Sequence, residues 1–491
     1  MKLKDLLAGV STLDFAGNQT EEIKGLAYSS KEVQPGFLFA ALKGEKKDGY
    51  SFIQEANKKG AVAFLSERER PQNFNKSWIQ TADARLALAL CSANFYAHPS
   101  QKMKVVGITG TKGKTTVTYL LEAILNKAGY APGVIGTISY RGPGVKIKAQ
   151  RTTPEAPDLQ RILSQMVDGG TTHCLIEVSS HALELKRVVG IGFDVAVFTN
   201  LSGEHLDYHH SMDNYFAAKK KLFYLNKKKR MAVINIDDPW GQKLIEEVPT
   251  GVISYGLESK AVVQAQKYSL NDHGLKLQVK YPGGVRNLAS PLLGLPNIYN
   301  ILASVATALT LSIPLPAIQE GVSSLKGVPG RFEKIKNSRG LNIFVDYAHT
   351  DNALRNLLET IRKFNPPRII LVFGAGGDRD KTKRKRMGKV ASQLADWTII
   401  TSDNPRSEDP LTIISEIEQG FTPAGVKKYE IEPDRRAAIR KALFMGEKGD
   451  YILVAGKGHE DYQIIGPKVI PFHDGQVIRE ILQEMESKNI G

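Results

Sequence analysis

The chain has few cysteines and no long apolar run, and each scarcity excludes a class of protein. Its two cysteines, Cys91 and Cys174, lie in separate apolar stretches, which excludes a disulfide framework and indicates a reducing compartment. No apolar run reaches the roughly 18 residues that a membrane-spanning helix needs. The first ten residues lack the apolar segment of a signal peptide. We therefore expect a cytoplasmic protein without a membrane partner.

The chain has fewer acidic than basic residues, 51 against 66, which gives a formal net charge of +15. Such a surface attracts polyanions, although each basic run by itself is typical of a solvated face. The runs also lack interleaved aromatic residues that could stack on bases, so we expect phosphate-bearing small molecules and no nucleic acid as partners. The runs are Lys219–Lys221, Lys227–Arg230 and Lys381–Arg386.

A chain of 491 residues is long enough for about three domains. Two turn-like stretches, His98–Ser100 and Gly327–Gly330, interrupt the periodic segments and suggest the boundaries. The first of them follows a helical pattern over Ala84–Tyr96. We therefore predict an N-terminal domain over residues 1–101, a central domain over 102–330 and a C-terminal domain over 331–491.

Short β-branched runs alternate with helical patterns after the first boundary, which is typical of parallel sheets covered by helices. We predict a small N-terminal α/β domain, a central domain with a mostly parallel P-loop-type sheet, and a Rossmann-like C-terminal α/β domain. Ligands of such sheets bind beyond the carboxyl ends of the strands, so the polar loops there are the candidate sites. The predicted strands are Lys104–Thr109, Cys174–Val178, Val195–Thr199, Met231–Ile236, Ile343–Asp346, Ile369–Phe373, Thr398–Thr401 and Tyr451–Ala455.

A glycine-containing loop lies between the first central strand and a helical pattern that starts near Val117. In this context backbone N–H groups and the helix N-terminus bind phosphates, Lys114 neutralises charge and the Thr115 hydroxyl binds Mg²⁺. The loop is shorter than the common P-loop, because the position of its usual first glycine falls on Ile108. Its residues are Gly110, Thr111, Lys112, Gly113, Lys114, Thr115 and Thr116.

Two further central strands end in side chains that can bind a metal ion. Glu177 ends one strand, and His205 follows another within a polar loop. Mg²⁺ in nucleotide sites takes one or two carboxylates together with phosphate oxygens, so Glu177 suits it, whereas an imidazole is a less typical ligand. Alone, each residue is typical of an ordinary hydrogen-bonding group; beside a phosphate loop, the metal interpretation is favoured.

The order of these motifs along nearly the whole chain resembles the Mur ligase family. A colinear set of this kind is far more specific than a single loop. The matching segments are GTKGKTT from Gly110, TTPEAPDL from Thr152, EVSSHAL from Glu177, NLSGEHLDYH from Asn200, LPNIYNILA from Leu295, GVPGRFE from Gly327, VDYAHTDNAL from Val345, FGAGGDRD from Phe373, SDNPRSEDP from Ser402 and GKGHEDYQ from Gly456.

The resemblance implies an ATP-dependent ligase of peptidoglycan precursor synthesis that activates a carboxylate as an acyl phosphate. The family branch that matches best extends UDP-N-acetylmuramoyl-L-alanyl-D-glutamate by one amino acid. By resemblance, Ser30 lies in the uridine-binding stretch Ser29–Ala40, and Thr152, Thr153, Ser179 and Arg187 hold the dipeptide. Guanidinium and hydroxyl groups suit its phosphates and carboxylates. We expect a monomer.

The resemblance also implies the ATP site, two Mg²⁺ ions and the catalytic residues Lys114, Lys219, Glu177 and His205. Lys219 aligns with a lysine that is carbamylated to N6-carboxylysine in the family, although its run of three lysines alone indicates a solvated surface. The implied metal ligands are Thr115, Glu177, His205 and carbamylated Lys219. Beyond the phosphate loop, the implied ATP-binding residues are Asn300, Arg331, Asp346 and His349.

The segment from Asp403 to Arg406 resembles the signature of family members that add meso-2,6-diaminopimelate. That amino acid carries a distal carboxylate that lysine lacks, and a fork-shaped guanidinium distinguishes the two. Arg406 is therefore the predicted specificity residue, and Glu460 is able to pair with the distal ammonium. The implied amino-acid-binding residues are Arg379, Asp403, Asn404, Pro405, Arg406, Gly456 and Glu460.

Four alternatives compete with this interpretation. One is the same reaction with L-lysine, which Arg406 opposes. Another is a folylpolyglutamate synthetase, which the long segment before the phosphate loop opposes. A basic P-loop NTPase acting on nucleic acid would need no amine acceptor. A catalytically silent binding protein would not need the intact phosphate and metal groups.

Overall fold

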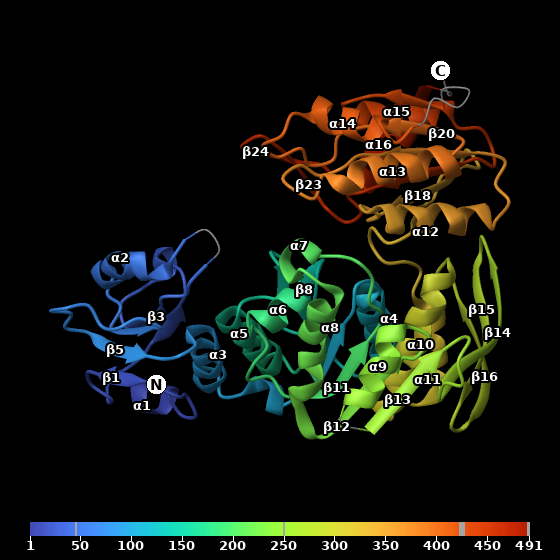
Figure 1. The fold of residues 1–491 in the computed structure, drawn as a ribbon. Coiled ribbons are helices and arrows are strands. Elements are labelled where there is room, and N and C mark those ends of the chain that lie inside the picture. Colours follow the sequence, from blue (N-terminus) through green and yellow to red (C-terminus); the bar gives the residue numbers. More distant parts are fainter. Residues whose placement is uncertain (45–46, 249–250, 422–427, 489–491) are drawn as a thin grey trace. The chain divides into compact units, whose positions relative to one another are not determined.

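The computed structural model describes residues 1–44, 47–248, 251–421 and 428–488, and for residues 226–230 and 488 it describes the backbone alone. The chain forms two compact units. The first unit contains Met1–Lys267, Gln278–Asn287 and Tyr299–Val322. The second unit contains Tyr268–Leu277, Leu288–Ile298 and the chain from Ser323 onward. Three α/β sheet layers occur in order along the chain (Figure 1).

The N-terminal part is a five-stranded sheet in the order β1-β5-β4-β3-β2, parallel except for β1 against β5. Its strands bury aromatic side chains on one face, where the Phe64 and Trp78 rings stack. The predicted helix over Ala84–Tyr96 is confirmed as α3 (Ala84–Phe95), which begins where the Asp83 carboxylate accepts the Leu86 N–H. The other elements are α1 (Leu3–Leu6), β1 (Asp14–Ala16), β2 (Gly25–Ala27), β3 (Phe37–Ala40), α2 (Ile53–Lys58), β4 (Ala63–Ser66) and β5 (Ser77–Gln80).

The central sheet has eleven strands in the order β16-β15-β14-β13-β12-β11-β6-β10-β7-β8-β9. The strands from β13 to β7 run parallel, which confirms the predicted mostly parallel sheet. The four central strands predicted from apolar runs are present as β6 (Lys104–Thr109), β10 (His173–Glu177), β11 (Phe193–Phe198) and β12 (Asn226–Asn235). The remaining strands are β7 (Pro132–Ile135), β8 (Ser139–Gly142), β9 (Val145–Lys148), β13 (Gly251–Gly256), β14 (Val263–Asn271), β15 (Gly274–Tyr281) and β16 (Gly284–Ser290).

Helices accompany the central strands and place their first turns close to strand ends (Figure 1). The helix after β6 confirms the helical pattern that starts near Val117, and it buries Val117, Leu120, Leu121 and Ile124. The basic run Lys227–Arg230 belongs to β12, and its side chains lie outside the described ones. The helices are α4 (Lys114–Lys127), α5 (Ala156–Asp168), α6 (Ser180–Glu184), α7 (Leu206–His209), α8 (Met212–Lys220), α9 (Pro239–Glu247), α10 (Leu295–Thr310) and α11 (Leu315–Ser324).

The C-terminal sheet has the order β17-β18-β22-β19-β20-β21 and is parallel except for β17 against β18. This confirms the Rossmann-like α/β prediction. The carboxyl ends of β18, β19, β20 and β22 share one edge, where an open sheet binds its ligands. The elements are β17 (Glu333–Ile335), β18 (Asn342–Asp346), α12 (Asp351–Arg362), β19 (Ile369–Phe373), α13 (Thr382–Leu394), β20 (Trp397–Ile400), α14 (Pro410–Glu418), β21 (Tyr429–Ile431), α15 (Arg435–Met445), β22 (Tyr451–Ala455), β23 (Tyr462–Ile465), β24 (Lys468–Pro471) and α16 (Asp474–Lys488).

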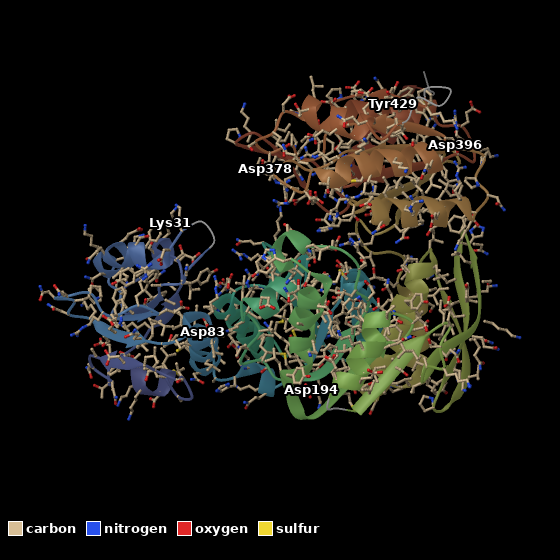
Figure 2. All side chains as sticks on the ribbon, in the orientation of Figure 1. Lys31, Asp83, Asp194, Asp378, Asp396 and Tyr429 are labelled. Carbon is tan, nitrogen blue, oxygen red and sulfur yellow. The ribbon has the colours of Figure 1, made fainter. Side chains whose placement is uncertain are left out.

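Two labelled aspartates in Figure 2 fix the starts of inner strands. The Asp194 carboxylate accepts the Val105 N–H of β6 at 2.9 Å, and the Asp396 carboxylate accepts the Ile369 N–H of β19 at 2.7 Å. Each carboxylate satisfies a backbone donor where a buried strand begins, a group that is costly to leave unpaired. The opposite ends of these strands carry the candidate site loops.

Among the described residues no helix is long and apolar enough to cross a membrane.

Candidate active site

The phosphate loop joins β6 to α4 through two glycines in left-handed backbone conformations. Gly110 has φ +147° and Gly113 has φ +89°. A Cβ at Gly110 would collide with the Thr199 hydroxyl, and one at Gly113 would collide with the Asn300 amide oxygen. Asn300, predicted on the ATP side, therefore lies directly at the loop. Because Gly113 gives the first turn of α4 no side-chain cap, that helix N-terminus can receive an anion.

The other loop side chains are held by the polar segment that follows β11. The Asn200 side chain accepts the Lys112 N–H at 3.0 Å, and the Lys112 ammonium pairs with Glu204. The Thr111 hydroxyl accepts the Ser202 N–H at 3.0 Å. The phosphate loop is thus held in place by the segment that follows β11. Thr116, the last predicted loop residue, is buried in the first turn of α4.

Glu177 and Thr115 meet at the end of β10. The Thr115 hydroxyl donates to Glu177 Oε2 at 2.9 Å, and the side chain of Glu177 is buried. Thr137, which sequence reasoning missed, donates to the same carboxylate through its hydroxyl at 2.9 Å and its N–H at 3.1 Å. A hydroxyl and a carboxylate in contact beside a phosphate loop are hard oxygen donors that fit Mg²⁺. The predicted Thr115 and Glu177 ligands are therefore brought together.

Lys219 is buried in α8 and does not belong to the solvated surface that its lysine run suggested. Its ammonium donates to the Gly110 carbonyl at 2.9 Å and lies 4.5 Å from the centre of the Tyr215 ring. Burial, reinforced by the charge of Lys114, holds the pKa of Lys219 well below its usual range. Lys114 donates to the same carbonyl at 2.8 Å. The two predicted catalytic lysines thus converge on one atom of the phosphate loop.

Carbamylation requires an unprotonated amine, because only that form attacks carbon dioxide, and the lowered pKa of Lys219 favours that form. The next two lysines of the run behave differently: Lys220 pairs with Glu247 and Lys221 pairs with Glu184 at the surface. The structure therefore separates one buried lysine from two that form ion pairs at the surface.

His205 lies in a left-handed turn, with φ +57°, just before α7. Partial removal from water, together with the nearby His181 and lysine charges, lowers the pKa of His205 to about 4. A neutral imidazole can act as a metal ligand. Its ring is 5.0 Å from His181 and 6.3 Å from Tyr215, two residues that sequence reasoning missed. Among the described residues no group of three or more His, Cys, Asp or Glu side chains forms a metal site, so the predicted set depends on Thr115 and modified Lys219.

The side chain of His209 supplies a test by pH. It is buried, its Nε2 is 2.9 Å from the Ser180 hydroxyl, and burial lowers its pKa to about 4. Because the folded pKa lies below the ordinary value near 6.5, His209 favours the folded state above pH 6.5 and opposes it as pH falls toward 4. Between pH 7 and 5 the wild type should lose about 1 to 2 kcal/mol more unfolding free energy than His209→Gln. Urea unfolding at both pH values measures this, and equal losses would contradict it.

The residues predicted to hold the dipeptide surround the backbone of Glu177. The Thr153 hydroxyl donates to the Glu177 carbonyl at 2.8 Å and accepts the Ser179 N–H at 3.1 Å. Arg187 donates to the Thr153 carbonyl and forms an ion pair of 2.8 Å with Glu155. Thr152 reaches the same network, because its hydroxyl is 3.1 Å from the Thr137 hydroxyl. Ser30 lies in the N-terminal sheet region, where its hydroxyl donates to Glu55.

Three of the predicted ATP residues belong to the second unit. The Arg331 guanidinium lies 4.6 Å above the Tyr347 ring, and its Nε is buried without a hydrogen-bond partner among the described residues. The Asp346 carboxylate accepts the Phe332 N–H at 2.7 Å, and His349 Nδ1 is 2.8 Å from the Tyr347 carbonyl. Arg331, Asp346 and His349 are thus brought together around Tyr347, while Asn300 belongs to the first unit.

The residues predicted to bind the amino-acid substrate lie beyond the carboxyl ends of β19, β20 and β22. Asn404 donates to Glu460 at 2.8 Å, and the buried Lys457, which sequence reasoning missed, donates to both of them. A Cβ at Gly456 would come within 2.5 Å of Asp403 Oδ2, which explains the glycine there.

Two arginines complete this group. Arg406 donates through Nη1 to the Gly377 carbonyl at 2.8 Å, and the carbonyl of Pro405 also packs against Gly377. Arg379 is in the same loop as Gly377 and donates to the Asp378 carbonyl. A Cβ at Gly376 would touch both arginine side chains. The site therefore brings two arginine side chains close to Gly376, and guanidinium groups suit the recognition of a substrate carboxylate.

The fold and the site define an α/β protein with a phosphate-binding loop beside oxygen donors that fit a metal ion. Three family models match the chain in order. They are described as Mur ligase family, catalytic domain, over residues 22–96; Mur ligase middle domain, over 108–308; and Mur ligase, glutamate ligase domain, over 330–458. The chain belongs to the Mur ligase family.

Relatives over the whole length carry a more particular name, UDP-N-acetylmuramoyl-L-alanyl-D-glutamate--2,6-diaminopimelate ligase. One from Caldanaerobacter subterraneus subsp. tengcongensis is 45% identical over 99% of this chain and 100% of its own. One from Alkaliphilus metalliredigens is 43% identical over 99% of this chain and 98% of its own. A solved structure with the same name matches with a TM-score of 0.70 at 30% identity, covering 99% of both chains.

Proposed function

We propose that this chain catalyses the ATP-dependent addition of meso-2,6-diaminopimelate to the D-glutamate carboxylate of UDP-N-acetylmuramoyl-L-alanyl-D-glutamate. The observation that carries the proposal is the convergence of the phosphate loop, Lys114, Lys219 and Glu177 at the carboxyl-end edge of the central sheet. The chain is also 45% identical to a relative named as the diaminopimelate-adding ligase. Such a centre binds the phosphates of ATP beside a carboxylate acceptor. The reaction is a step of peptidoglycan precursor synthesis.

The chain's own residues position the first half-reaction. The loop backbone and the N-terminus of α4 bind the phosphates, and Lys114 offsets the charge that develops on the transferred γ-phosphate. Thr152, Thr153, Ser179 and Arg187 orient the dipeptide so that its D-glutamate carboxylate attacks that phosphorus. ADP leaves and an acyl phosphate remains. Asn300, Arg331, Asp346 and His349 are proposed to bind the rest of ATP.

Two Mg²⁺ ions are proposed to bind at Thr115, Glu177, His205 and carbamylated Lys219. When bound, they supply positive charge that stabilises the phosphoryl oxygens in the transition state. The oxygen donors of Thr115 and Glu177, already in contact, support this assignment. The neutral His205 imidazole and the low pKa of Lys219 support the other two ligands.

The second half-reaction joins the amine of diaminopimelate to the acyl carbon and releases phosphate. Arg406 is proposed to bind the distal carboxylate and Glu460 the distal ammonium, with Arg379, Asp403, Asn404, Pro405 and Gly456 forming the remaining contacts. The pairing of Asn404 with Glu460 and of Arg406 with Gly377 supports a preformed pocket.

The same proposal includes the organisation of the chain. We assign the uridine-binding domain to residues 1–101, the ATP-binding domain to 102–330 and the amino-acid-binding domain to 331–491. We infer that the enzyme acts as a monomer, because one chain supplies every residue of the proposed sites. We also infer that it works in the cytoplasm, where ATP and UDP-linked precursors are made.

Phosphate release from ATP tests the proposal directly. With UDP-N-acetylmuramoyl-L-alanyl-D-glutamate present, we expect sustained release and a tripeptide product with meso-diaminopimelate, and little of either with L-lysine or without an amine. Product analysis by mass spectrometry distinguishes ligation from hydrolysis. A preference for lysine would overturn the assigned acceptor, and release that ignores all amines would overturn the ligase reaction.

A further inference from the structure

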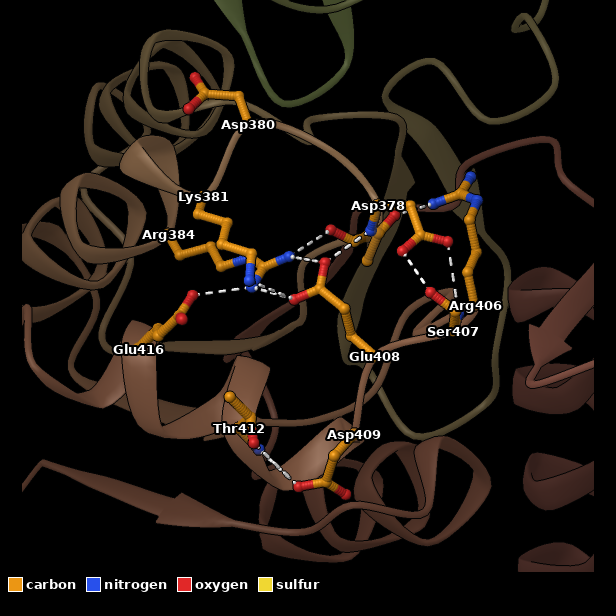
Figure 3. Close-up of polar contacts among 12 residues, drawn as sticks. Asp378, Asp380, Lys381, Arg384, Arg406, Ser407, Glu408, Asp409, Thr412 and Glu416 are labelled. Carbon is orange, nitrogen blue, oxygen red and sulfur yellow. Dashed lines mark hydrogen bonds and ion pairs between the residues drawn. The ribbon is translucent and has the colours of Figure 1, made fainter. Parts of the chain in front are cut away.

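The loops after β19 and β20, which carry Arg379 and Arg406, are joined by two carboxylates (Figure 3). Glu408 Oε1 accepts the backbone N–H of Asp378 at 2.6 Å, so the second loop holds the backbone of the first. In return, the Asp378 carboxylate accepts the Ser407 hydroxyl at 2.6 Å and the Ser407 N–H at 3.3 Å. Each loop is therefore held by a charged acceptor from the other.

A buried arginine binds both of these loops. The Arg384 side chain is 0% exposed and binds Glu408 through two hydrogen bonds, Nη1 to Oε2 at 2.8 Å and Nη2 to Oε1 at 2.9 Å. Nη2 also donates to the Gly376 carbonyl at 3.2 Å. The bidentate pair lowers the pKa of Glu408 to about 2, so its carboxylate is charged at any working pH. The anchor thus reaches both loops at once.

Both loops adopt backbone conformations that need such support. Asp378 has φ +53° and Arg406 has φ +54°, in the left-handed region that side chains other than glycine seldom occupy. Conformations of this kind persist where the surrounding contacts impose them, and they cluster at functional sites. The Arg406 guanidinium itself rests on the Gly377 carbonyl, the residue before Asp378. Its position therefore depends on the segment that Glu408 and Arg384 hold.

We infer that Glu408 is a positioning residue for the amino-acid substrate. Together with Asp378 and Arg384 it holds the Gly377 carbonyl that supports the Arg406 guanidinium, and it thereby sets the preference for an acceptor that carries a distal carboxylate. Glu408 acts through the loop backbone and not by touching the substrate. The inference rests on the proposed function and adds to it the origin of acceptor selectivity.

Glu408→Gln tests this role against a matched control, Glu416→Gln. Glu416 also pairs with Arg384, through Nη1 at 2.7 Å, but it lies in α14, and within the described part of the chain no hydrogen bond or ion pair joins its carboxylate to either loop. For Glu408→Gln we expect the KM for meso-diaminopimelate to rise about tenfold, the scale of one lost charge-assisted hydrogen bond, with the KM values for ATP and the UDP-dipeptide unchanged. The ratio of kcat/KM for diaminopimelate over L-lysine should fall with it. Glu416→Gln should keep all of these values within about twofold of the wild type.

The outcomes separate a positioning role from a general structural one. An equal rise in all three KM values in Glu408→Gln, or the same loss in both variants, would mean that Glu408 only stabilises the fold and would overturn the inference. An unchanged KM for diaminopimelate would overturn it as well. The wild type is assayed first, and if it makes no tripeptide from diaminopimelate, the proposed function fails. If the wild type is active but the Glu408→Gln variant has an unchanged KM for diaminopimelate, only the positioning role is rejected.

Discussion

Lys219→Ala is expected to lower kcat by roughly 100- to 1000-fold, the usual cost of deleting a preorganised electrostatic group from a transition-state site. The physical reason is the environment of the amine. It is fully buried, it is bonded to the Gly110 carbonyl, and its pKa is held well below the usual range, so it can take up carbon dioxide and present a carboxylate. Alanine would remove the proposed carboxylate and leave space for a small acid.

Added acetate or formate should therefore restore part of the activity of Lys219→Ala, and ¹³C NMR of the wild type in labelled bicarbonate should show a carbamate signal that the variant lacks. Lys220→Ala is the matched control, because the adjacent lysine pairs with Glu247 at the surface. Its kcat should stay near that of the wild type. A Lys219→Ala enzyme of normal kcat would remove Lys219 from the catalytic set, and a severe loss without a carbamate signal would reject the modification.

Arg406→Ala and Arg406→Lys are expected to weaken transition-state binding of diaminopimelate by about 2 to 5 kcal/mol, roughly 30-fold to several-thousand-fold in kcat/KM. Alanine leaves the distal carboxylate of the substrate unpaired in a polar pocket. Lysine keeps the positive charge but loses the planar fork that binds a carboxylate through two parallel hydrogen bonds. Steady-state kinetics with diaminopimelate and with L-lysine measures the loss and its selectivity.

Arg436→Ala provides the control for charge removal in the same sheet domain, because Arg436 pairs with Glu480 and Glu484 on the surface of α15 and α16. Its kcat/KM for diaminopimelate should remain within about twofold of the wild type. In the Arg406 variants the loss should be much smaller for L-lysine, which has no distal carboxylate. Equal losses for both amino acids would reject carboxylate recognition by Arg406, and unchanged kinetics would remove it from the pocket.

Parallel strands and their end loops were the features most accessible from sequence. Buried strands such as β19 and β22 are unbroken β-branched and apolar runs, a pattern that few other elements share. Strands β14 to β16 were missed, although β15 alternates buried apolar residues with polar ones and a Pro-Gly-Gly turn separates it from β16. This alternation differs from the unbroken apolar runs by which the buried parallel strands were recognised.

The sequence by itself determined the order of the motifs, the phosphate loop with its two required glycines, and the residue types that suit phosphate, Mg²⁺ and a dicarboxylic amino acid. These features are local, since a turn conformation or a strand end depends on neighbours in the chain. Tertiary structure alone decided that Lys219 is buried while Lys220 is not, that Thr137 and Lys457 join the site, and that Glu408 holds the loop after β19. Burial and pairing of this kind arise from segments far apart in the chain, so no local pattern records them.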